Sequence, residues 1–278
     1  MDGRPQHLIP VPDSELRRPL LDRKFRRQVA WVSPMLLPLR DDNPTAIRPI
    51  MTVSLKAVNV LVFLYQLSLG AQGGQLFIYQ FGAIPAAVFG SQSLPEDLAA
   101  IPASLSVLTS MFLHGGFVHL IGNMLYLWIF GNNVEDAMGH VRFVLFYLLT
   151  GVAASMTHFL MDVDSTIPTI GASGAISGVL GAYILLYPRA QVMVLIFLGI
   201  FIRLMYIPAG IVLGFYFILQ IFQGTLTWGQ EGGGVAWFAH IGGFVAGLLL
   251  VGPFKKRKVR FFNPPHHHDR QMERWHSH

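Results

Sequence analysis

The feature that most constrains this chain is a set of six apolar segments separated by more polar connectors. A helix needs about 20 apolar residues to cross a bilayer, and each segment reaches that length if its flanking residues add a turn. The apolar residues fall in blocks, which favours spanning helices over a lipid-facing barrel. We therefore predict an all-α polytopic membrane protein with six transmembrane helices. The segments are Val53 to Leu69, Leu113 to Phe130, Val141 to Met161, Gly171 to Tyr187, Tyr206 to Ile221 and Val235 to Val251.

Charge is scarce between the two ends of the chain. Hydrophobic residues make up 53% of the sequence and charged residues 13%, a balance outside the usual range of a soluble domain. The net charge of +5 would suggest nucleic acid for a soluble protein, but here many of the basic residues lie in two tails beside the apolar segments. We interpret 1–50 as a basic N-terminal tail, 51–252 as the membrane domain and 253–278 as a basic, His-rich C-terminal tail. The expected surroundings are a lipid bilayer, with no nucleic-acid partner.

The positions of Lys and Arg predict the orientation in the membrane. The connectors after the first, third and fifth segments contain neither residue. The opposite side carries both tails, so the positive-inside rule predicts two cytoplasmic termini, in a prokaryotic cell (inner) membrane. The run Val192 to Ile202 is too short to span, and we interpret it as an interfacial or partly inserted connector. The long first connector, Gly70 to Thr109, is expected on or in the outer leaflet.

Two segments open with small residues around a polar side chain. The fourth begins Gly171-Ala172-Ser173-Gly174 and continues to Gly178. The sixth contains Ala239-His240-Ile241-Gly242-Gly243 and continues to Gly247. Small residues allow two helices to approach closely, as a serine requires if a histidine is to take its proton. The alternative readings are plain helix packing for the serine and a neutral imidazole bonded to a carbonyl for the histidine.

The second segment supplies three further polar side chains, His114, His119 and Asn123. His119 and Asn123 are four residues apart and so share one helical face. Together with the backbone N–H of Ser173, they could bind the negative oxygen of a tetrahedral intermediate. The alternative is polar bonding between helices, worth on average about 0.6 kcal/mol.

These residues carry a resemblance to a known family. The runs Gly171 to Gly174, His119 to Asn123 and Ala239 to Gly243 resemble the rhomboid motifs Gly-x-Ser-Gly, His-xxx-Asn and Ala-His-x-Gly-Gly. They occur in the family's order, on segments four, two and six respectively. The resemblance covers Val53 to Val251 and implies a rhomboid-like bundle of six helices.

The resemblance also implies an activity and roles for residues. Rhomboids are intramembrane serine proteases with a Ser-His dyad and no acid, so Ser173 would be the nucleophile and His240 the general base. His119, Asn123 and the Ser173 amide would form the oxyanion hole. The expected reaction is hydrolysis of a peptide bond in or beside a transmembrane segment of another membrane protein, near the outer face of the bilayer. Gly131 and Glu135 match the family's pattern at the inner end of the second segment, where the glutamate is expected to be structural.

The sequence departs from the family's pattern in two places. The first connector lacks the Trp-Arg pair of some rhomboids, which leaves its anchoring open. Ser177 stands where many rhomboids have an aromatic ring that stacks on the catalytic histidine. His240 would then be held by a hydrogen bond to Ser177 or by another ring.

Other functions remain as alternatives. A catalytically silent rhomboid-like protein that binds and escorts membrane proteins would lack the serine or the histidine, whereas this chain has both. A transporter or channel would continue its polar residues inward, but here they are confined to the outer half. His158 is expected to be a packing or interfacial histidine, and the His266 to His268 tract is expected to be solvated. The chain has no cysteine for a thiolate site, and we assign neither a metal nor another cofactor.

Overall fold

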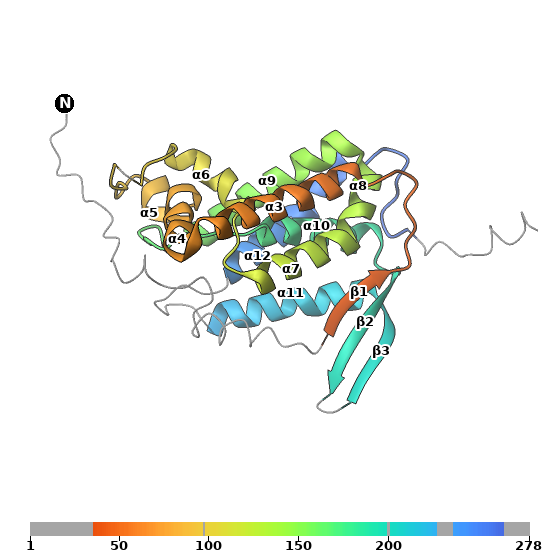
Figure 1. Ribbon diagram of the computed structural model, residues 1–278. Coiled ribbons are helices and arrows are strands. Elements are labelled where there is room, and N and C mark those ends of the chain that lie inside the picture. Colours follow the sequence, from red (N-terminus) through yellow and green to blue (C-terminus); the bar gives the residue numbers. More distant parts are fainter. Residues whose placement is uncertain (1–35, 97, 199–200, 227–235, 264–278) are drawn as a thin grey trace, which may run out of the picture.

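The computed structural model describes residues 36–96, 98–198, 201–226 and 236–263. This part of the chain is mostly helical, with a small sheet at one end of the bundle (Figure 1). Most of both predicted tails lies outside the described residues, including the His266 to His268 tract. The long helices are α3 (Ile50–Ser68), α9 (His140–Phe159), α10 (Ser173–Leu186), α11 (Ala209–Leu226) and α12 (Trp237–Phe254). One continuous helical stretch comprises α7 (Phe117–Tyr126), the π-helical turn η2 (Leu127–Gly131) and α8 (Asn132–Met138).

Within the described residues, four helices are long and apolar enough to cross a membrane, namely α3, α9, α11 and α12. A fifth span results if Ala103–Phe112 and Phe117–Met138, which are bent by 80° at their junction, count as one. The protein is therefore an integral membrane protein with four to five candidate spans, fewer than the six predicted. When the bent pair is counted as the fifth span, the fourth predicted segment accounts for the remaining difference, because α10 has 14 residues and is only about 21 Å long.

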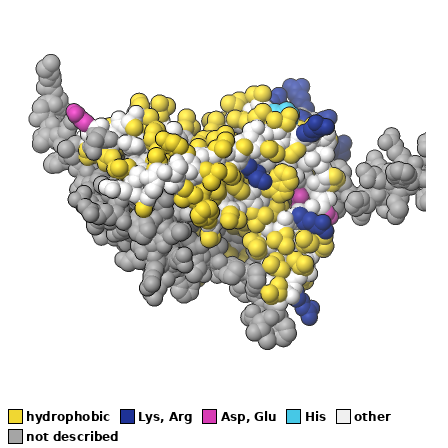
Figure 2. Space-filling view, in the orientation of Figure 1, with side chains coloured by type: hydrophobic (Ala, Val, Ile, Leu, Met, Phe, Trp, Pro, Cys, Tyr) yellow, Lys and Arg dark blue, Asp and Glu magenta, His cyan; other side chains and the backbone are white. Residues whose placement is uncertain are grey.

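Helix α10 lies in the middle of the bundle (Figure 1) and is buried along nearly its whole length. A helix that is apolar on all sides is buried either in a protein core or in lipid, and α10 is surrounded by neighbouring helices. The outer helices instead expose large apolar side chains, such as Leu61 and Leu64 on α3 and Ile218 on α11. Figure 2 shows this apolar flank, with most Lys and Arg of the described chain at the end where α8 and the sheet lie.

Glycines set the close approach of α10 to α12. A Cβ atom at Gly243 would lie 2.0 Å from the carbonyl oxygen of Gly174, and one at Gly247 would lie 2.0 Å from that of Gly178. On the other side of α10, a Cβ at Gly178 would lie 2.4 Å from Thr150 Cβ on α9. Two of these contacts are with backbone atoms, so a change of side-chain rotamer could not remove the clash that a larger residue would cause.

The all-α prediction requires a correction at the basic end of the molecule. Strands β1 (Leu36–Asp41), β2 (Gln191–Leu198) and β3 (Phe201–Pro208) form an antiparallel sheet in the order β1-β2-β3. The run Val192 to Ile202, interpreted as an interfacial connector, instead contains nearly all of β2 and the first residues of β3. Part of the predicted N-terminal tail forms the neighbouring strand, β1. The run is rich in Val, Ile and Phe, which favour strands. Val192 and Val194 anchor it, since both are fully buried against the bundle.

The long first connector contains α4 (Gly70–Phe81) and two shorter helices, α5 (Pro85–Val88) and α6 (Ala103–Thr109), followed by the 3₁₀ turn η1 (Ser110–Phe112). Backbone hydrogen bonds tie it to the segment that precedes α10. The Ala83 N–H donates to the Thr169 carbonyl at 3.1 Å, and the Thr169 N–H donates to the Ala83 carbonyl at 2.8 Å. The connector is therefore anchored next to the start of α10 without the Trp-Arg pair.

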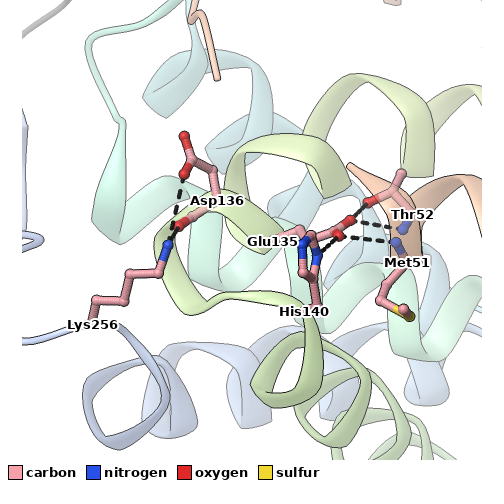
Figure 3. Close-up of polar contacts among 6 residues, drawn as sticks. All are labelled: Met51, Thr52, Glu135, Asp136, His140 and Lys256. Atoms are coloured by element: carbon pink, nitrogen blue, oxygen red, sulfur yellow. Dashed lines mark hydrogen bonds and ion pairs between the residues drawn. The ribbon is translucent and has the colours of Figure 1, made fainter. Parts of the chain in front are cut away.

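Glu135 joins three helices at the basic end (Figure 3). Its fully buried carboxylate accepts from the backbone N–H groups of Met51 at 2.9 Å and Thr52 at 2.8 Å, and from the Thr52 hydroxyl at 2.7 Å. His140 Nδ1 lies 2.5 Å from Oε1, the oxygen that also accepts from Met51. A carboxylate is favourable at a helix N-terminus because the first N–H groups have no partner within the helix. These contacts suit the structural role expected for Glu135. Figure 3 also shows Lys256 donating to the Asp136 carbonyl at 2.6 Å, which ties the end of α12 to α8.

Asp41 attaches β1 to the bundle. Its Oδ2 accepts from the Tyr183 hydroxyl at 2.6 Å and from Asn133 Nδ2 at 2.8 Å. Burial raises the pKa of the Asp41 carboxyl from its ordinary 3.8 to about 6, although the bond from Tyr183 acts in the opposite direction. The folded protein therefore holds the proton more tightly than the unfolded chain does.

This raised pKa predicts a pH dependence of stability. Because the folded pKa exceeds the unfolded one, Asp41 favours folding most at about pH 4 or below, and this contribution falls by about 2 to 3 kcal/mol as pH rises to about 6. Asp41→Asn keeps an acceptor oxygen and is neutral at every pH. The wild type should therefore lose stability relative to Asp41→Asn as pH rises. The melting temperature of the variant, measured relative to that of the wild type, should be a few degrees higher at pH 7 than at pH 4. The same difference at both pH values would contradict this assignment.

Candidate active site

Ser173 and His240, predicted on separate segments, are in direct contact. Ser173 is the first residue of α10, and His240 lies in the first turn of α12. The Ser173 Oγ is 2.8 Å from His240 Nε2. The side chain of Ser173 is partly exposed, whereas His240 is 9% exposed. A neutral imidazole whose Nε2 carries no proton can accept the serine hydroxyl proton at this distance.

The backbone before Ser173 has a conformation that favours glycine. Gly171 has φ +120°, and its N–H donates to the Ser110 carbonyl at 2.8 Å. A Cβ at Gly171 would lie 2.7 Å from both Cε1 and Nε2 of His119. The imidazole of His119 therefore lies directly against the turn that leads into Ser173.

The other polar residues of the second segment contact one another. Asn123 Nδ2 lies 3.0 Å from Nε2 of the fully buried His114, and the His114 and His119 rings are 5.0 Å apart. The Gly115 N–H is 3.5 Å from His119 Nδ1. The Asn123 amide has two hydrogens, so one remains when the other bonds to His114. The structure thus brings His119 to the turn before Ser173 and pairs Asn123 with His114.

Small residues bring the neighbouring helices together around this pair. A Cβ at Gly174 would lie 2.6 Å from Ala154 Cβ, and one at Gly242 would lie 2.2 Å from Thr157 Oγ1. Ala239 is buried beside Gly174. A small cavity of about 20 Å³ opens beside Ser173, enough for about one water molecule. Its lining includes Ser110, Met111, Gly151, Ala154, Gly171 and Ala239.

No group of three or more His, Cys, Asp or Glu side chains with a geometry for a metal ion is present among the described residues. His158 lies near the end of α9, with its ring centroid 6.4 Å from that of Phe159. The sequence-based assignment of no metal and no cofactor stays a prediction.

Comparison with known proteins gives the family. The Rhomboid domain matches residues 103–257, which is more than half of the chain. This protein belongs to the rhomboid family. The resemblance expected from the three sequence motifs is confirmed.

Several curated rhomboid proteins are similar to this chain. Rhomboid protein 1, mitochondrial, of Saccharomyces cerevisiae is 28% identical over 192 residues, which is 62% of this chain and 51% of the yeast protein. Rhomboid protease GluP of Bacillus subtilis is 35% identical over 205 residues, 66% of this chain and 38% of GluP. RHOMBOID-like protein 6, mitochondrial, of Arabidopsis thaliana is 31% identical over 151 residues, 52% and 41% of the two chains. The aligned part is about half the length of these relatives or less.

In this rhomboid, His240 has a neighbour that sequence reasoning missed. Gln220 of α11 places its Oε1 2.7 Å from His240 Nδ1, and the Gln220 side chain is only 6% exposed. The signal for it was a lone amide within an otherwise apolar segment, which is costly in a membrane unless it has a partner.

Ser177, which was considered as the residue that holds His240, has a different partner. Its hydroxyl lies 2.8 Å from the Tyr216 hydroxyl on α11. The alternative in which a hydrogen bond from Ser177 holds His240 is therefore wrong, since the His240 ring nitrogens contact Gln220 and Ser173 instead. An aromatic neighbour does exist, since the Trp237 ring meets the His240 ring edge-on, with centroids 6.1 Å apart.

Proposed function

We propose that this rhomboid is an intramembrane serine endopeptidase that cleaves transmembrane segments of other membrane proteins near the outer face of the bilayer. The observation that carries the proposal is the 2.8 Å contact between Ser173 Oγ and His240 Nε2. A serine hydroxyl is a weak nucleophile by itself, and an adjacent base is the usual means of activating it.

In the proposed reaction, Ser173 Oγ attacks the substrate carbonyl carbon while His240 Nε2 takes the hydroxyl proton. The tetrahedral intermediate carries a negative oxygen, for which the Ser173 amide, His119 and the second Asn123 hydrogen are the proposed donors. Collapse of the intermediate breaks the C–N bond, and His240 returns its proton to the leaving amine. A water molecule then attacks the acyl-enzyme with His240 as base and releases the carboxylate and Ser173. The cavity beside Ser173 has room for that water.

The short α10 supports a site below the membrane surface. The hydrocarbon core is roughly 30 Å thick and α10 is about 21 Å long, so with the C-terminal end of α10 at the inner face, its first residue, Ser173, lies inside the core. We propose that α10, the fourth predicted segment, completes a bundle of six transmembrane helices. We also propose that both termini are cytoplasmic and that the membrane is a prokaryotic cell membrane. Lys and Arg at the end opposite Ser173 support this orientation. Relatives are also named for mitochondria and chloroplasts, so family membership alone does not decide which membrane it is.

The proposed substrate is a helix that unwinds locally, because a helical peptide bond has its carbonyl engaged in hydrogen bonding. Gly or Pro near the scissile bond would favour such cleavage, since both are poor helix formers. No nucleic acid and no cofactor takes part in this proposal. The rival function is a catalytically silent rhomboid-like protein that binds and escorts membrane proteins.

Labelling separates the two functions. A fluorophosphonate reacts with a serine only if a base activates its hydroxyl, so purified protein in detergent should be modified at Ser173, as located by mass spectrometry. His240→Ala should slow this labelling at least 100-fold. Ser106→Ala is the matched control, because Ser106 is a buried serine whose hydroxyl donates only to a backbone carbonyl, and it should label at the wild-type rate. A folded protein that resists the reagent at Ser173 would favour the escort function.

A further inference from the structure

We propose that Gln220 is a third member of the catalytic arrangement, a positioning residue that fixes the orientation and tautomer of His240. This inference rests on the proposed protease function. The family's pattern implies a dyad with nothing further on the histidine. In this protein both ring nitrogens of His240 have a side-chain partner, Ser173 on Nε2 at 2.8 Å and Gln220 on Nδ1 at 2.7 Å.

The two contacts select one tautomer of the neutral imidazole. A neutral histidine carries one N–H, and its other ring nitrogen accepts. If Nδ1 carries the proton, it donates to the carbonyl oxygen of Gln220, and Nε2 keeps the lone pair that takes the Ser173 proton. If Nε2 carried the proton instead, it could not act as the base. A carbonyl acceptor at Nδ1 therefore holds His240 in the form that the reaction requires.

The position of Gln220 suits this role inside a membrane. Both side chains are nearly buried, with 6% of Gln220 and 9% of His240 exposed, so solvent does not replace the contact. A carboxylate at this depth would be costly, whereas an amide orients the ring without a net charge. When His240 gains the serine proton, its Nδ1–H becomes a stronger donor, and the bond to Gln220 strengthens as the positive charge develops.

A second polar contact on the same helix provides a control for docking of α11. Tyr216 lies four residues before Gln220, and its hydroxyl contacts Ser177 of α10 at 2.8 Å. Loss of either contact removes one polar link between α11 and its neighbours. Only loss of the Gln220 contact removes an acceptor from His240. The two substitutions thus separate orientation of the base from anchoring of the helix.

The test compares three variants on a single-span membrane-protein reporter. Gln220→Met keeps the length of the side chain and removes the acceptor, so kcat should fall about 10- to 100-fold with KM little changed. Gln220→Glu keeps an acceptor oxygen whether its carboxyl is ionised or protonated, and should retain at least about a third of the wild-type kcat. Tyr216→Phe should stay within about threefold of the wild type. Equal losses in Gln220→Met and Tyr216→Phe would mean that α11 docking is what matters, and would overturn the proposal.

A measurement without turnover tests the same inference separately. In protein with ¹⁵N-labelled histidine, the His240 signals, assigned by their absence from His240→Ala, should report the Nδ1–H tautomer. They should report a mixture in Gln220→Met. If the wild type cleaves the reporter while Gln220→Met keeps full kcat and the same tautomer, the proposed role of Gln220 is wrong and the proposed protease function stands. If the wild type shows neither cleavage nor labelling of Ser173, both the protease function and the role of Gln220 are wrong.

Discussion

Ser173→Ala is expected to lower cleavage of a transmembrane reporter by about 10⁴-fold or more, to the limit of detection. The substitution removes the atom that forms the acyl-enzyme, and no other described serine contacts His240. His240→Ala should cause a loss of similar size, because the hydroxyl then has no base. The double variant should be no slower than either single one, since residues that act as a unit are not additive.

Stability should hardly change in Ser173→Ala, and this makes the result of that variant interpretable. Ser173 is partly exposed, and the bond from its hydroxyl to His240 is worth on the order of 1 kcal/mol. The melting temperature of Ser173→Ala in the same detergent should therefore lie within a few degrees of the wild type. Ser106→Ala again serves as the control and should cleave normally. Wild-type turnover in Ser173→Ala would rule out the serine mechanism.

Gly247→Ala is expected to have the largest effect on stability. The added Cβ would lie 2.0 Å from the carbonyl oxygen of Gly178, far inside van der Waals contact. Both atoms belong to helices that are packed on other neighbours, so α10 and α12 would have to separate. We expect a loss of several kcal/mol of unfolding free energy, and thermal unfolding should begin at a much lower temperature. Cleavage should also fall, because Ser173 and His240 lie on these two helices.

Gly214→Ala is the matched control for that substitution. Gly214 lies within α11, and a Cβ there would meet nothing within 4 Å. Alanine is the better helix former by about 1 kcal/mol, so this variant should be as stable as the wild type or slightly more so. If Gly247→Ala melted and cleaved like Gly214→Ala, the proposed tight packing between α10 and α12 would be wrong.

The amino-acid sequence alone determined the class of the protein and the segments that carry its unusual residues. Blocks of apolar residues predict membrane helices because such helices satisfy their own backbone hydrogen bonds in lipid. The predicted first segment, Val53 to Leu69, lies almost within α3, and the predicted sixth overlaps most of α12. The small residues beside Ser173 and His240 indicated a close helix contact, and the Gly174 and Gly243 backbones make one.

Only the tertiary structure decided which side chains meet. Local pattern did not distinguish a buried strand from an interfacial connector at Val192, because an apolar run is compatible with both and a strand needs partners from distant segments. Spacing along α11 likewise gave no partner for Gln220, which lies 20 residues from His240 in the sequence but 2.7 Å from it in space. The sequence states which polar residue lies on which segment, whereas the partner of each polar group depends on how the helices pack around it.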